Sequence, residues 1–444
     1  MKLRAHQTRA IDRCADAYGS GARSVLLVAP TGFGKTATAS HLILRSVANG
    51  LRVLFVVHRL EIVRDTVRRL RAAGLRVGVI VAGLEPDPGA PVQVATIQTI
   101  DARGLGGFRP DFVVTDEAHH GAAATYRALY AQCAPRWHLG LTATPVRADG
   151  AGLADAFEVL VVGATVAELT PDYLVPCDAI VPPTSMRGSI ALDEVVALER
   201  HCAGRASVVF VPTVARARDV AARAPRAAAI FGGMPVEERA AALADFQLGA
   251  IDTLVTVYVL TEGWDCPRAD TVVLARTFGH VGAYLQTVGR ALRLDASRPS
   301  KRALIVDLGD NVRTHGMPAD EREYSLEGDP IRTSAKSPRL CPLCGAVKRA
   351  DETACWRCGE AYPAPKPTKV RSDALVAFDG DTTWSASKQD YLDRQHVLAA
   401  SRGYASGWAS HRFRVRFGHW PTFAPSDTAQ ALAGHARAMR RVST

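Results

Sequence analysis

Apolar and polar positions along the chain fall into two repeating series. The first series contains the apolar runs SVLLVA, VLFVV, VQVAT, DFVVTDE and HLGLTAT, and the second contains SVVFV, AAIF, DTLVTV, TVVLA and ALIVDL. Stretches with apolar residues at helical spacing separate the runs, for example residues 61–74 and 235–249. Strands that are apolar on both faces and alternate with helices are typical of parallel sheets covered on both sides. The series break around residues 146–166, so the pattern predicts an α/β fold with two lobes, 1–150 and 165–325.

The pattern changes after about residue 328. A cysteine-rich segment occupies 339–362, and the stiff spacer PAPKPTK follows it. The last segment, 372–425, combines arginines with aromatic residues. From Arg394 to the end the chain has eight arginines and a single acid, Asp427. We therefore expect a small unit held by its cysteines and, after it, a small, mostly helical basic module.

The composition is that of a globular protein with a basic balance. The chain has 444 residues, 48% of them hydrophobic, with a formal net charge of +10 and a pI of about 9.3. This charge favours a polyanionic partner. The start, MKLRAHQTRAIDRC, lacks the apolar core of a signal peptide, and no run approaches the roughly 18 apolar residues of a membrane span. We expect a soluble, intracellular protein that is not secreted and does not bind membranes.

The first candidate site is the turn PTGFGKT, which stands between an apolar run and a helix-like stretch. Gly32 and Gly34 allow the backbone to wrap closely around phosphate oxygens, and Lys35 would reach the terminal phosphates. The Thr36 hydroxyl would bind Mg²⁺, and the following helix presents its positive end to the same anions. Ala29 stands where the strict pattern has glycine, so only the Gly-Lys-Thr half is matched and a chance loop is the alternative.

A second candidate is the strand FVVTDEAHH, which ends in two carboxylates. Asp116 at the strand tip suits coordination of Mg²⁺, and Glu117 suits activation of the attacking water. A solvated acidic turn is the alternative, but such a turn would not require the apolar strand that precedes it. Phosphate loop and acidic strand tip together predict hydrolysis of a nucleoside triphosphate.

A third candidate, QTVGRALR, lies in the second lobe. The spacing predicts a helix that places Gln286, Arg290 and Arg293 on one face, at i, i+4 and i+7. An arginine brought across a cleft onto the γ-phosphate stabilises the charge of the transition state and raises the rate by several orders of magnitude. A helix of surface arginines is the alternative.

These motifs, in this order, resemble those of the superfamily 2 helicases and translocases, of the DEAH-type group that includes the excision-repair helicases and many phage and bacterial relatives. The resemblance covers roughly residues 1–315. It implies two RecA-like lobes with ATP between them and nucleic acid across their tops, so that ATP closes the lobes and hydrolysis releases them. Where the family commonly has Gly before an aromatic and Leu, this chain has PDYL at 171–174, a loop difference that leaves the ATPase motifs intact.

The resemblance assigns further residues. Gln7 falls where the family reads adenine, and Thr142 and Thr144 of LTATP would couple hydrolysis to movement. The residues implied to bind the nucleotide are Gln7, Thr31, Gly32, Gly34, Lys35, Thr36, Gly263 and Asp265. Those implied to act in hydrolysis are Glu117, Asp116, Lys35, Arg290, Arg293 and Gln286, with Thr36 and Asp116 on the Mg²⁺. Those implied to touch nucleic acid are His58, Arg59, Thr96, Gln98, Thr213 and Thr261.

Four of the nine cysteines form two C-x2-C pairs separated by ten residues: Cys341, Cys344, Cys355 and Cys358. Thiolates at this spacing suit tetrahedral Zn²⁺, and the metal would hold a zinc ribbon at 339–362 that is too small to fold on its own core. Redox dithiols are the alternative. A structural clip and a nucleic-acid contact are both open as the role of this ribbon.

The tail stretch YASGWASHRFRVRFGHWP alternates arginines with aromatics. Arg412, Arg414 and Arg416 would contact phosphates while the rings stack on bases. In the alternative reading the aromatics form the module's own core, and both readings can hold together. The segment resembles the tails of phage-type helicases, which suggests a specificity module at 372–425.

The sequence thus predicts an ATP-dependent DNA helicase that couples ATP hydrolysis to translocation on and unwinding of DNA, with ATP, Mg²⁺ and Zn²⁺ as cofactors. DNA is preferred to RNA because the motif wording resembles the DNA-acting branch and because the chain lacks the long accessory domains of the DEAH RNA helicases. The alternatives are a double-strand DNA translocase without strand separation, an RNA helicase, and an ATP-switched zinc-ribbon nucleic-acid-binding protein. The resemblance suggests the cytoplasm of a bacterial or phage-infected cell.

Overall fold

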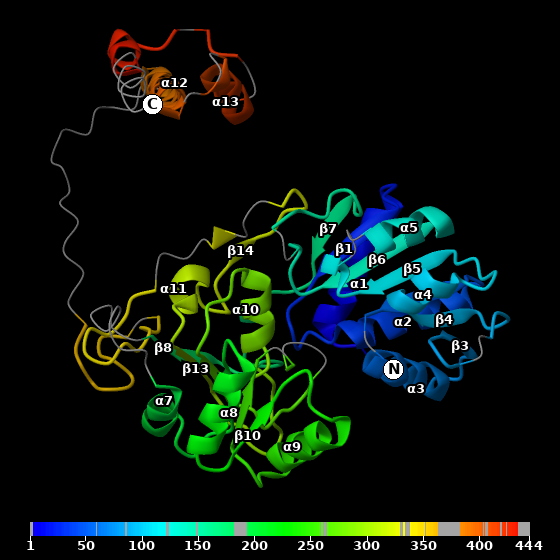
Figure 1. The fold of residues 1–444 in the computed structure, drawn as a ribbon. Coiled ribbons are helices and arrows are strands. Elements are labelled where there is room, and N and C mark those ends of the chain that lie inside the picture. The colour runs from blue at the N-terminus through cyan, green and yellow to red at the C-terminus, as the bar shows by residue number, and fades with distance from the viewer. Residues whose placement is uncertain are drawn as a thin grey trace. The chain divides into compact units, whose positions relative to one another are not determined.

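The computed structural model describes both predicted lobes, the cysteine-rich segment and part of the C-terminal module (Figure 1). The described residues are 3–58, 60–84, 87–120, 124–147, 150–181, 193–257, 259–260, 264–328, 332–333, 338–350, 352–362, 382–402, 404, 407–417, 420–422 and 424–433. The chain divides into two compact units, Met1–Pro363 and Ala364–Thr444. Within these ranges no helix has the length and apolar character needed to cross a membrane.

The first lobe is built on a seven-stranded sheet in the order β3-β4-β2-β5-β6-β1-β7, with all described pairs parallel. Its strands are β1 (Ser24–Val28), β2 (Val53–Val57), β3 (Val77–Ile80), β4 (Val92–Thr96), β5 (Phe112–Asp116), β6 (Trp137–Thr142) and β7 (Val159–Val162). Its helices are α1 (Ala5–Gly19), α2 (Lys35–Ala48), α3 (Leu60–Ala72), α4 (Ile97–Arg103), the 3₁₀ turn η1 (Ala118–His120) and α5 (Ala124–Cys133).

The second lobe is built on a six-stranded parallel sheet in the order β10-β11-β9-β12-β13-β8. Its strands are β8 (Cys177–Ile180), β9 (Ser207–Phe210), β10 (Ala227–Ile230), β11 (Thr253–Thr256), β12 (Thr271–Leu274) and β13 (Ala303–Asp307). Its helices are α6 (Val166–Leu169), α7 (Glu194–His201), α8 (Val214–Arg223), α9 (Val236–Leu248), α10 (Val281–Val288) and α11 (Asn311–His315).

Strand β1 shows why continuous apolar runs become central strands. Val25 and Leu27 pack into one hydrophobic cluster, while Leu26 and Val28 pack into another, so the strand is buried on both faces. Every apolar run of the two predicted series forms a strand of one sheet or the other. The predicted α/β fold with two parallel-sheet lobes is therefore confirmed.

Strands β3, β7 and β8 are absent from the predicted series. Each has four residues and lies at the edge of its sheet. An edge strand pairs on one side only, and β7 is also less buried than the central strands. Its sequence therefore carries a weaker apolar signal than a strand covered on all sides.

After the second lobe, the chain returns to the first. Leu326 accepts backbone hydrogen bonds from Leu153 (2.8 Å) and Ala154 (3.0 Å). Tyr324 and Leu326 pack against a cluster that includes Ala118 of the acidic strand tip. The short hairpin of β14 (Arg322–Glu323) and β15 (Arg332–Thr333) belongs to this returning segment, which therefore ties the two lobes together.

The cysteine-rich segment docks on the outer edge of β8. The backbone N–H of Val181 donates to Gly345 (2.9 Å), and that of Val347 donates to Ala179 (2.8 Å), which forms an antiparallel bridge. Trp356 packs against the core cluster of the second lobe. The segment is therefore an extension of the second lobe.

The C-terminal unit contains the helices α12 (Thr382–Arg402) and α13 (Trp408–Phe417). They pack through a small core of Leu392, Ala409 and Phe413. A hydrogen bond links the chain beyond α13 to α12, because the carboxylate of Asp393 accepts the backbone N–H of Ser426 (2.8 Å). The predicted helical character of this module is confirmed.

Candidate active site and metal centre

The phosphate-loop candidate forms the turn between β1 and α2. Gly32 and Gly34 have φ angles of +94° and +91°, a region that favours glycine. A Cβ at Gly32 would lie 2.5 Å from a methyl group of Leu174, and a Cβ at Gly34 would clash with the side-chain amide of Gln7. Both positions need glycine for two reasons, backbone conformation and close packing.

Gln7 of α1 is held against this turn. Its Nε2 donates to the carbonyl of Phe33 (3.0 Å), and its Oε1 accepts the backbone N–H of Arg4 (2.9 Å). The side chain is buried. The structure thus brings the residue that the resemblance assigns to adenine into contact with the phosphate loop.

The acidic strand tip lies at the end of β5. Asp116 is 5% exposed, and its Oδ1 is buried without a hydrogen-bond partner among the described residues. A buried carboxylate oxygen in this position needs a donor or a cation, because an unsatisfied buried acceptor is costly. Asp116 and Thr36 line the same pocket, and oxygen ligands are those that Mg²⁺ prefers. The two residues therefore fit the predicted Mg²⁺ site.

The buried charges of the site influence one another. Burial lowers the pKa of Lys35, although the nearby Glu117 and Asp116 act in the opposite direction. Burial and the neighbouring Glu117 raise the pKa of Asp116. Burial alone would raise the pKa of Glu117, but the neighbouring His119 and the charge of Lys35 bring it below its ordinary value. Of the two carboxyl groups, Glu117 is therefore the more acidic.

A chain of contacts runs from this carboxylate to the LTATP motif. Nδ1 of His119 lies 3.4 Å from the carboxylate of Glu117 and 3.2 Å from Oγ1 of Thr142. Oγ1 of Thr142 donates to the carbonyl of Thr144 (2.7 Å), so it accepts from His119. Glu117 itself has a φ of +48°, which is uncommon for a residue with a side chain.

The predicted helix through Gln286, Arg290 and Arg293 is wrong. Helix α10 ends at Val288, and Gly289 follows it where a Cβ would lie 2.8 Å from the Cβ of Thr31. Beyond Gly289 the backbone continues in tighter turns, with hydrogen bonds from the N–H of Arg290 to Thr287 (3.2 Å) and from that of Ala291 to Val288 (3.1 Å), and glycine favours such a change because it stabilises a helix poorly. Arg290 lies in a turn and Arg293 in a backbone bridge with Leu174. Gln286 is buried in α10.

Both arginines nevertheless reach a pocket of about 670 Å³ between the lobes. Small-molecule sites commonly have about 300–1,000 Å³. The predicted residues that line the pocket are Gln7, Thr31, Gly32, Gly34, Lys35, Thr36, Asp116 and Glu117 from the first lobe and Asp265, Arg290 and Arg293 from the second. Arg290 donates to the carbonyl of Trp264, and Arg293 forms an ion pair with Asp265. Cations on both walls suit a polyphosphate.

Sequence reasoning missed part of this site. Arg4, Asp65 and Arg69 also line the pocket. The guanidinium carbon of Arg4 lies 4.8 Å from the ring centroid of Tyr173, whose neighbour Leu174 covers Gly32. The sequence signal for these contacts was the segment PDYL at 171–174. It places an aromatic and an apolar residue between the two lobes, where both can pack against other residues.

The residues assigned to nucleic acid are partly brought together. Nε2 of Gln98 lies 3.3 Å from Nδ1 of His58, which joins two motifs that are distant in sequence. Thr96 is buried with its hydroxyl bonded to a neighbouring threonine, and Thr213 accepts a hydrogen bond at the start of α8. Three predicted residues lie outside the described ranges: Arg59, Thr261 and Gly263.

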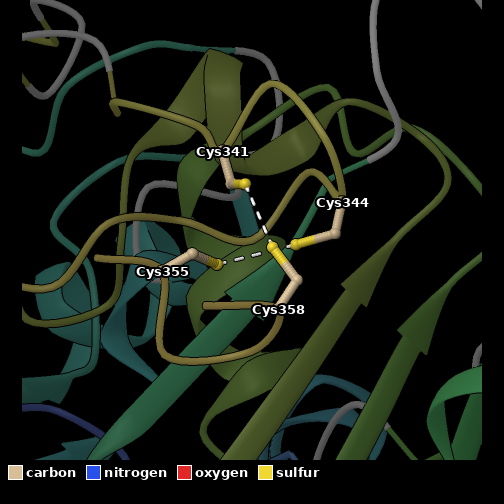
Figure 2. Close-up of side chains that lie close together, drawn as sticks. All are labelled: Cys341, Cys344, Cys355 and Cys358. Atoms are coloured by element: carbon tan, nitrogen blue, oxygen red, sulfur yellow. Dashed lines mark hydrogen bonds between the residues drawn. The ribbon is translucent and has the colours of Figure 1, made fainter. Parts of the chain in front are cut away.

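The four clustered cysteines converge on one point (Figure 2). Their sulfurs all lie within 4.8 Å of one another, and the pairs Cys341–Cys358 and Cys344–Cys355 are each 3.6 Å apart. A tetrahedral site with Zn–S bonds of about 2.3 Å has its sulfurs about 3.8 Å apart. The cluster therefore fits Zn²⁺.

In the C-terminal unit, the aromatics are divided between core and surface. Phe413 is fully buried, whereas Trp420 is 50% exposed. The guanidinium of Arg412 lies 5.7 Å from the ring centroid of Trp408, and that of Arg414 lies 4.9 Å from that of Trp420. The side chain of Arg416 is outside the described part of the chain.

Two family models match the two lobes. The model described as "Type III restriction enzyme, res subunit" matches residues 1–147, and "Helicase conserved C-terminal domain" matches residues 190–295. The chain belongs to the superfamily 2 helicase-like family. The predicted family is therefore confirmed.

Two relatives are similar to most of this chain. The helicase-like chain is 26% identical over 380 residues to the "51.5 kDa protein" of a Lactococcus phage (isolate 7-9), covering 79% of this chain and 81% of that one. It is 27% identical over 372 residues to the "Putative mitochondrial ATP-dependent helicase irc3" of Schizosaccharomyces pombe, covering 74% of this chain and 61% of that relative, less than two thirds of its length.

A solved structure shares the fold of this helicase-like protein. It is the fragment structure of a putative HsdR subunit of a type I restriction enzyme from Vibrio vulnificus, with a TM-score of 0.59 and 20% identity. The likeness covers 74% of this chain and 67% of that one. The two chains therefore share the two-lobed fold.

Proposed function

We propose that this helicase-like protein is an ATP-dependent DNA helicase. The observation that carries the proposal is the pocket that the two lobes share, with Lys35, Asp116 and Glu117 on one wall and Arg290 and Arg293 on the other. A site divided in this way assembles only when the lobes are close. ATP binding and lobe closure are therefore coupled.

The side chains divide the work of hydrolysis. Lys35 and the backbone of the phosphate loop would hold the phosphates, and Thr36 and Asp116 would hold Mg²⁺, which would offset phosphate charge. Glu117, ionised and oriented by His119, positions the attacking water and accepts its proton. Arg290 and Arg293 stabilise the charge that develops on the transferred phosphoryl group.

Movement follows from the same contacts. When phosphate leaves, Arg290 and Arg293 lose their partner on the first lobe, and the cleft is free to open. The contact from Glu117 through His119 to Thr142 carries the state of the acidic tip into the LTATP segment. Two lobes that each grip a nucleic-acid backbone and alternately close and open would step along it.

DNA is the proposed track for two reasons. The motif wording resembles the DNA-acting branch, and the family model matching residues 1–147 is the one described for a restriction-enzyme subunit. His58 and Gln98, in contact with each other, would form one grip on the backbone. The exposed Trp420 beside Arg414 offers a second, stacking contact in the C-terminal unit.

A double-strand translocase that does not separate strands is the second candidate. The observation in its favour is the similarity of the first lobe to a restriction-enzyme subunit together with the shared fold of an HsdR fragment. An RNA helicase and an ATP-switched binding protein are the remaining alternatives. Each of them predicts a different response to nucleic acid.

The first experiment measures steady-state ATP hydrolysis with Mg²⁺ and no nucleic acid, single-stranded DNA, forked DNA, blunt duplex or RNA. Glu117→Gln should lower the rate by at least about 10²-fold, as removal of a catalytic group does. Glu199→Gln, on the exposed face of α7, is the matched control and should leave it unchanged. Absence of turnover with every nucleic acid would contradict the proposal.

A second experiment separates the two DNA candidates. A helicase displaces the strand of a fork, whereas a duplex translocase displaces the third strand of a triplex and leaves a fork intact. Stimulation by single-stranded or forked DNA with fork unwinding would support the helicase. Stimulation by blunt duplex with triplex displacement alone would establish the translocase instead.

A further inference from the structure

A second pocket lies where the cysteine-rich segment meets the second lobe. Its volume is about 330 Å³, and it shares no lining residue with the nucleotide cleft. The residues that line it come from β8, from the amino end of β13, from the end of α7 and the loop after it, and from the cysteine-rich segment. Four segments that are distant in sequence thus enclose one hollow.

The wall of this pocket is strongly basic. Its positively charged or titratable lining residues are Arg200, His201, Arg205, Arg302, Arg349 and Arg357, and Asp178 is its acidic lining residue. Asp178 accepts two hydrogen bonds from Arg302 (both 2.9 Å) and two from Arg349 (2.7 and 2.8 Å). Arg349 also forms an ion pair with Glu352 (3.4 Å), so these two guanidiniums face two carboxylates, and any excess charge has to come from the other arginines of the wall.

Arg357 adds a charge that its protein partners do not offset. Its guanidinium donates to the carbonyl of Cys344 (3.3 Å) and to Nδ1 of His201, and neither group is a carboxylate. Because a guanidinium only donates, His201 accepts at Nδ1 and carries its proton on Nε2. Among the described residues, neither Arg357 nor the exposed Arg200 forms an ion pair with a carboxylate.

Excess guanidinium charge around a hollow of this size matches one ligand chemistry. Phosphate oxygens accept several charge-assisted hydrogen bonds, and arginine is the side chain best shaped to give them. We propose that this pocket binds a phosphate group, either free or as part of a nucleic-acid backbone. The proposal does not depend on ATP hydrolysis in the cleft.

The cysteine cluster builds one side of the phosphate pocket. Arg357 lies between Cys355 and Cys358, two of the predicted zinc ligands. Arg349 and Trp356 line the pocket from the same segment. The indole N–H of Trp356 donates to the carbonyl of Val347 (3.0 Å), which fixes the ring beside the pocket. The cysteine cluster therefore serves both as a clip on β8 and as part of an anion site.

The test uses the full chain in a Lys35→Ala background, which weakens phosphate binding at the nucleotide cleft. Inorganic phosphate is titrated calorimetrically at constant ionic strength, and a single-stranded DNA is titrated at several salt concentrations. Arg200→Ala is the variant, because Arg200 is exposed and lines the pocket. Arg239→Ala, in α9 and outside both pockets, is the matched control.

We expect Arg200→Ala to weaken phosphate, DNA or both by about tenfold, the effect of one charge-assisted contact, while Arg239→Ala has no effect. Weakening of inorganic phosphate alone identifies a free anion as the ligand. A weaker DNA complex with a salt slope reduced by about one identifies a backbone phosphate. Unchanged binding of both ligands by Arg200→Ala would overturn the proposal.

A second variant tests whether Arg200→Ala weakens binding only indirectly. Arg357→Gln removes the charge but keeps an amide donor for the carbonyl of Cys344 and for His201. It should weaken the same ligand as Arg200→Ala, with the metal content and melting temperature of the parent protein retained. Normal binding by Arg357→Gln would also overturn the proposal.

Discussion

The guanidinium of Arg293 lies 3.2 Å from the carboxylate of Asp265, and both side chains line the nucleotide pocket. Asp265 is 64% exposed on its side chain, whereas Arg293 is 26% exposed. The pair is therefore held at the mouth of a cleft whose other wall carries Lys35. A bound polyphosphate would compete with Asp265 for this arginine, because it presents more negative charge at the same place.

Removal of Arg293 and removal of Arg290 should have different effects. Arg293→Ala should lower kcat about 10³-fold, the loss typical of an arginine that stabilises phosphoryl transfer, with an unchanged melting temperature. Arg290→Ala should lower kcat and also reduce stability by about 1–3 kcal/mol, because Arg290 is buried and its removal leaves the carbonyl of Trp264 unsatisfied. Steady-state ATPase assays and thermal melts check both outcomes. Arg293→Ala with a near-normal rate would remove Arg293 from the active site.

The phosphate loop depends on glycine at position 34. Gly34→Ala should abolish nucleotide binding, because the new Cβ would meet the side chain of Gln7 and the residue would keep its positive φ. Gly50→Ala is the matched control, since Gly50 has a φ of +79° but open space around it. Both variants should lose about 1 kcal/mol of stability from the strained backbone. Fluorescent-nucleotide titrations should separate them, and equal nucleotide affinities would contradict the steric argument.

The cysteine cluster should be a structural zinc site. Cys341→Ser should lose bound zinc, measured by elemental analysis, and lower the melting temperature of the second lobe, because the segment bridges to β8 and Arg349 holds Asp178. Cys133→Ser, outside the cluster, should retain the metal. Full thermal stability in a zinc-free Cys341→Ser protein would show that the metal does not hold this edge.

Acid should destabilise the first lobe through His138. Burial lowers the pKa of His138 to about 3, while its ring packs between Tyr130 and Phe157 and bonds Thr115 (3.2 Å). The unfolded chain protonates this residue near pH 6.5, so the stability it contributes is complete above that pH and declines as the pH falls towards 3. At pH 5 the loss should be about 2 kcal/mol.

Urea unfolding at pH 7.5 and pH 5.0 checks this expectation. His138→Gln keeps a polar side chain that does not titrate in this range, so its stability should fall by about 2 kcal/mol less than that of the parent protein. Equal losses in the two proteins would assign the acid sensitivity to other groups.

Much of the fold and of the cleft follows from local sequence. The central strands can be predicted from their apolar runs, because a strand covered on both faces has to be apolar along its length. The turn at Gly32 and Gly34 and the strand tip at Asp116 are local features, so their chemistry is readable before any folding is considered. The convergence of Cys341 and its partners is fixed by their spacing.

The sequence by itself therefore determined the central strands of both sheets, the phosphate loop, the acidic tip and the cysteine cluster, because each depends on residues close together in the chain. The tertiary structure alone decided where α10 ends, how Leu174 covers Gly32 and how Arg357 meets His201. Helical spacing predicts a continuous face through Arg293, but the regular helix ends at Val288 and tighter turns follow it. Such features depend on packing between segments that are distant in the chain, and no local sequence pattern indicates contacts of this kind.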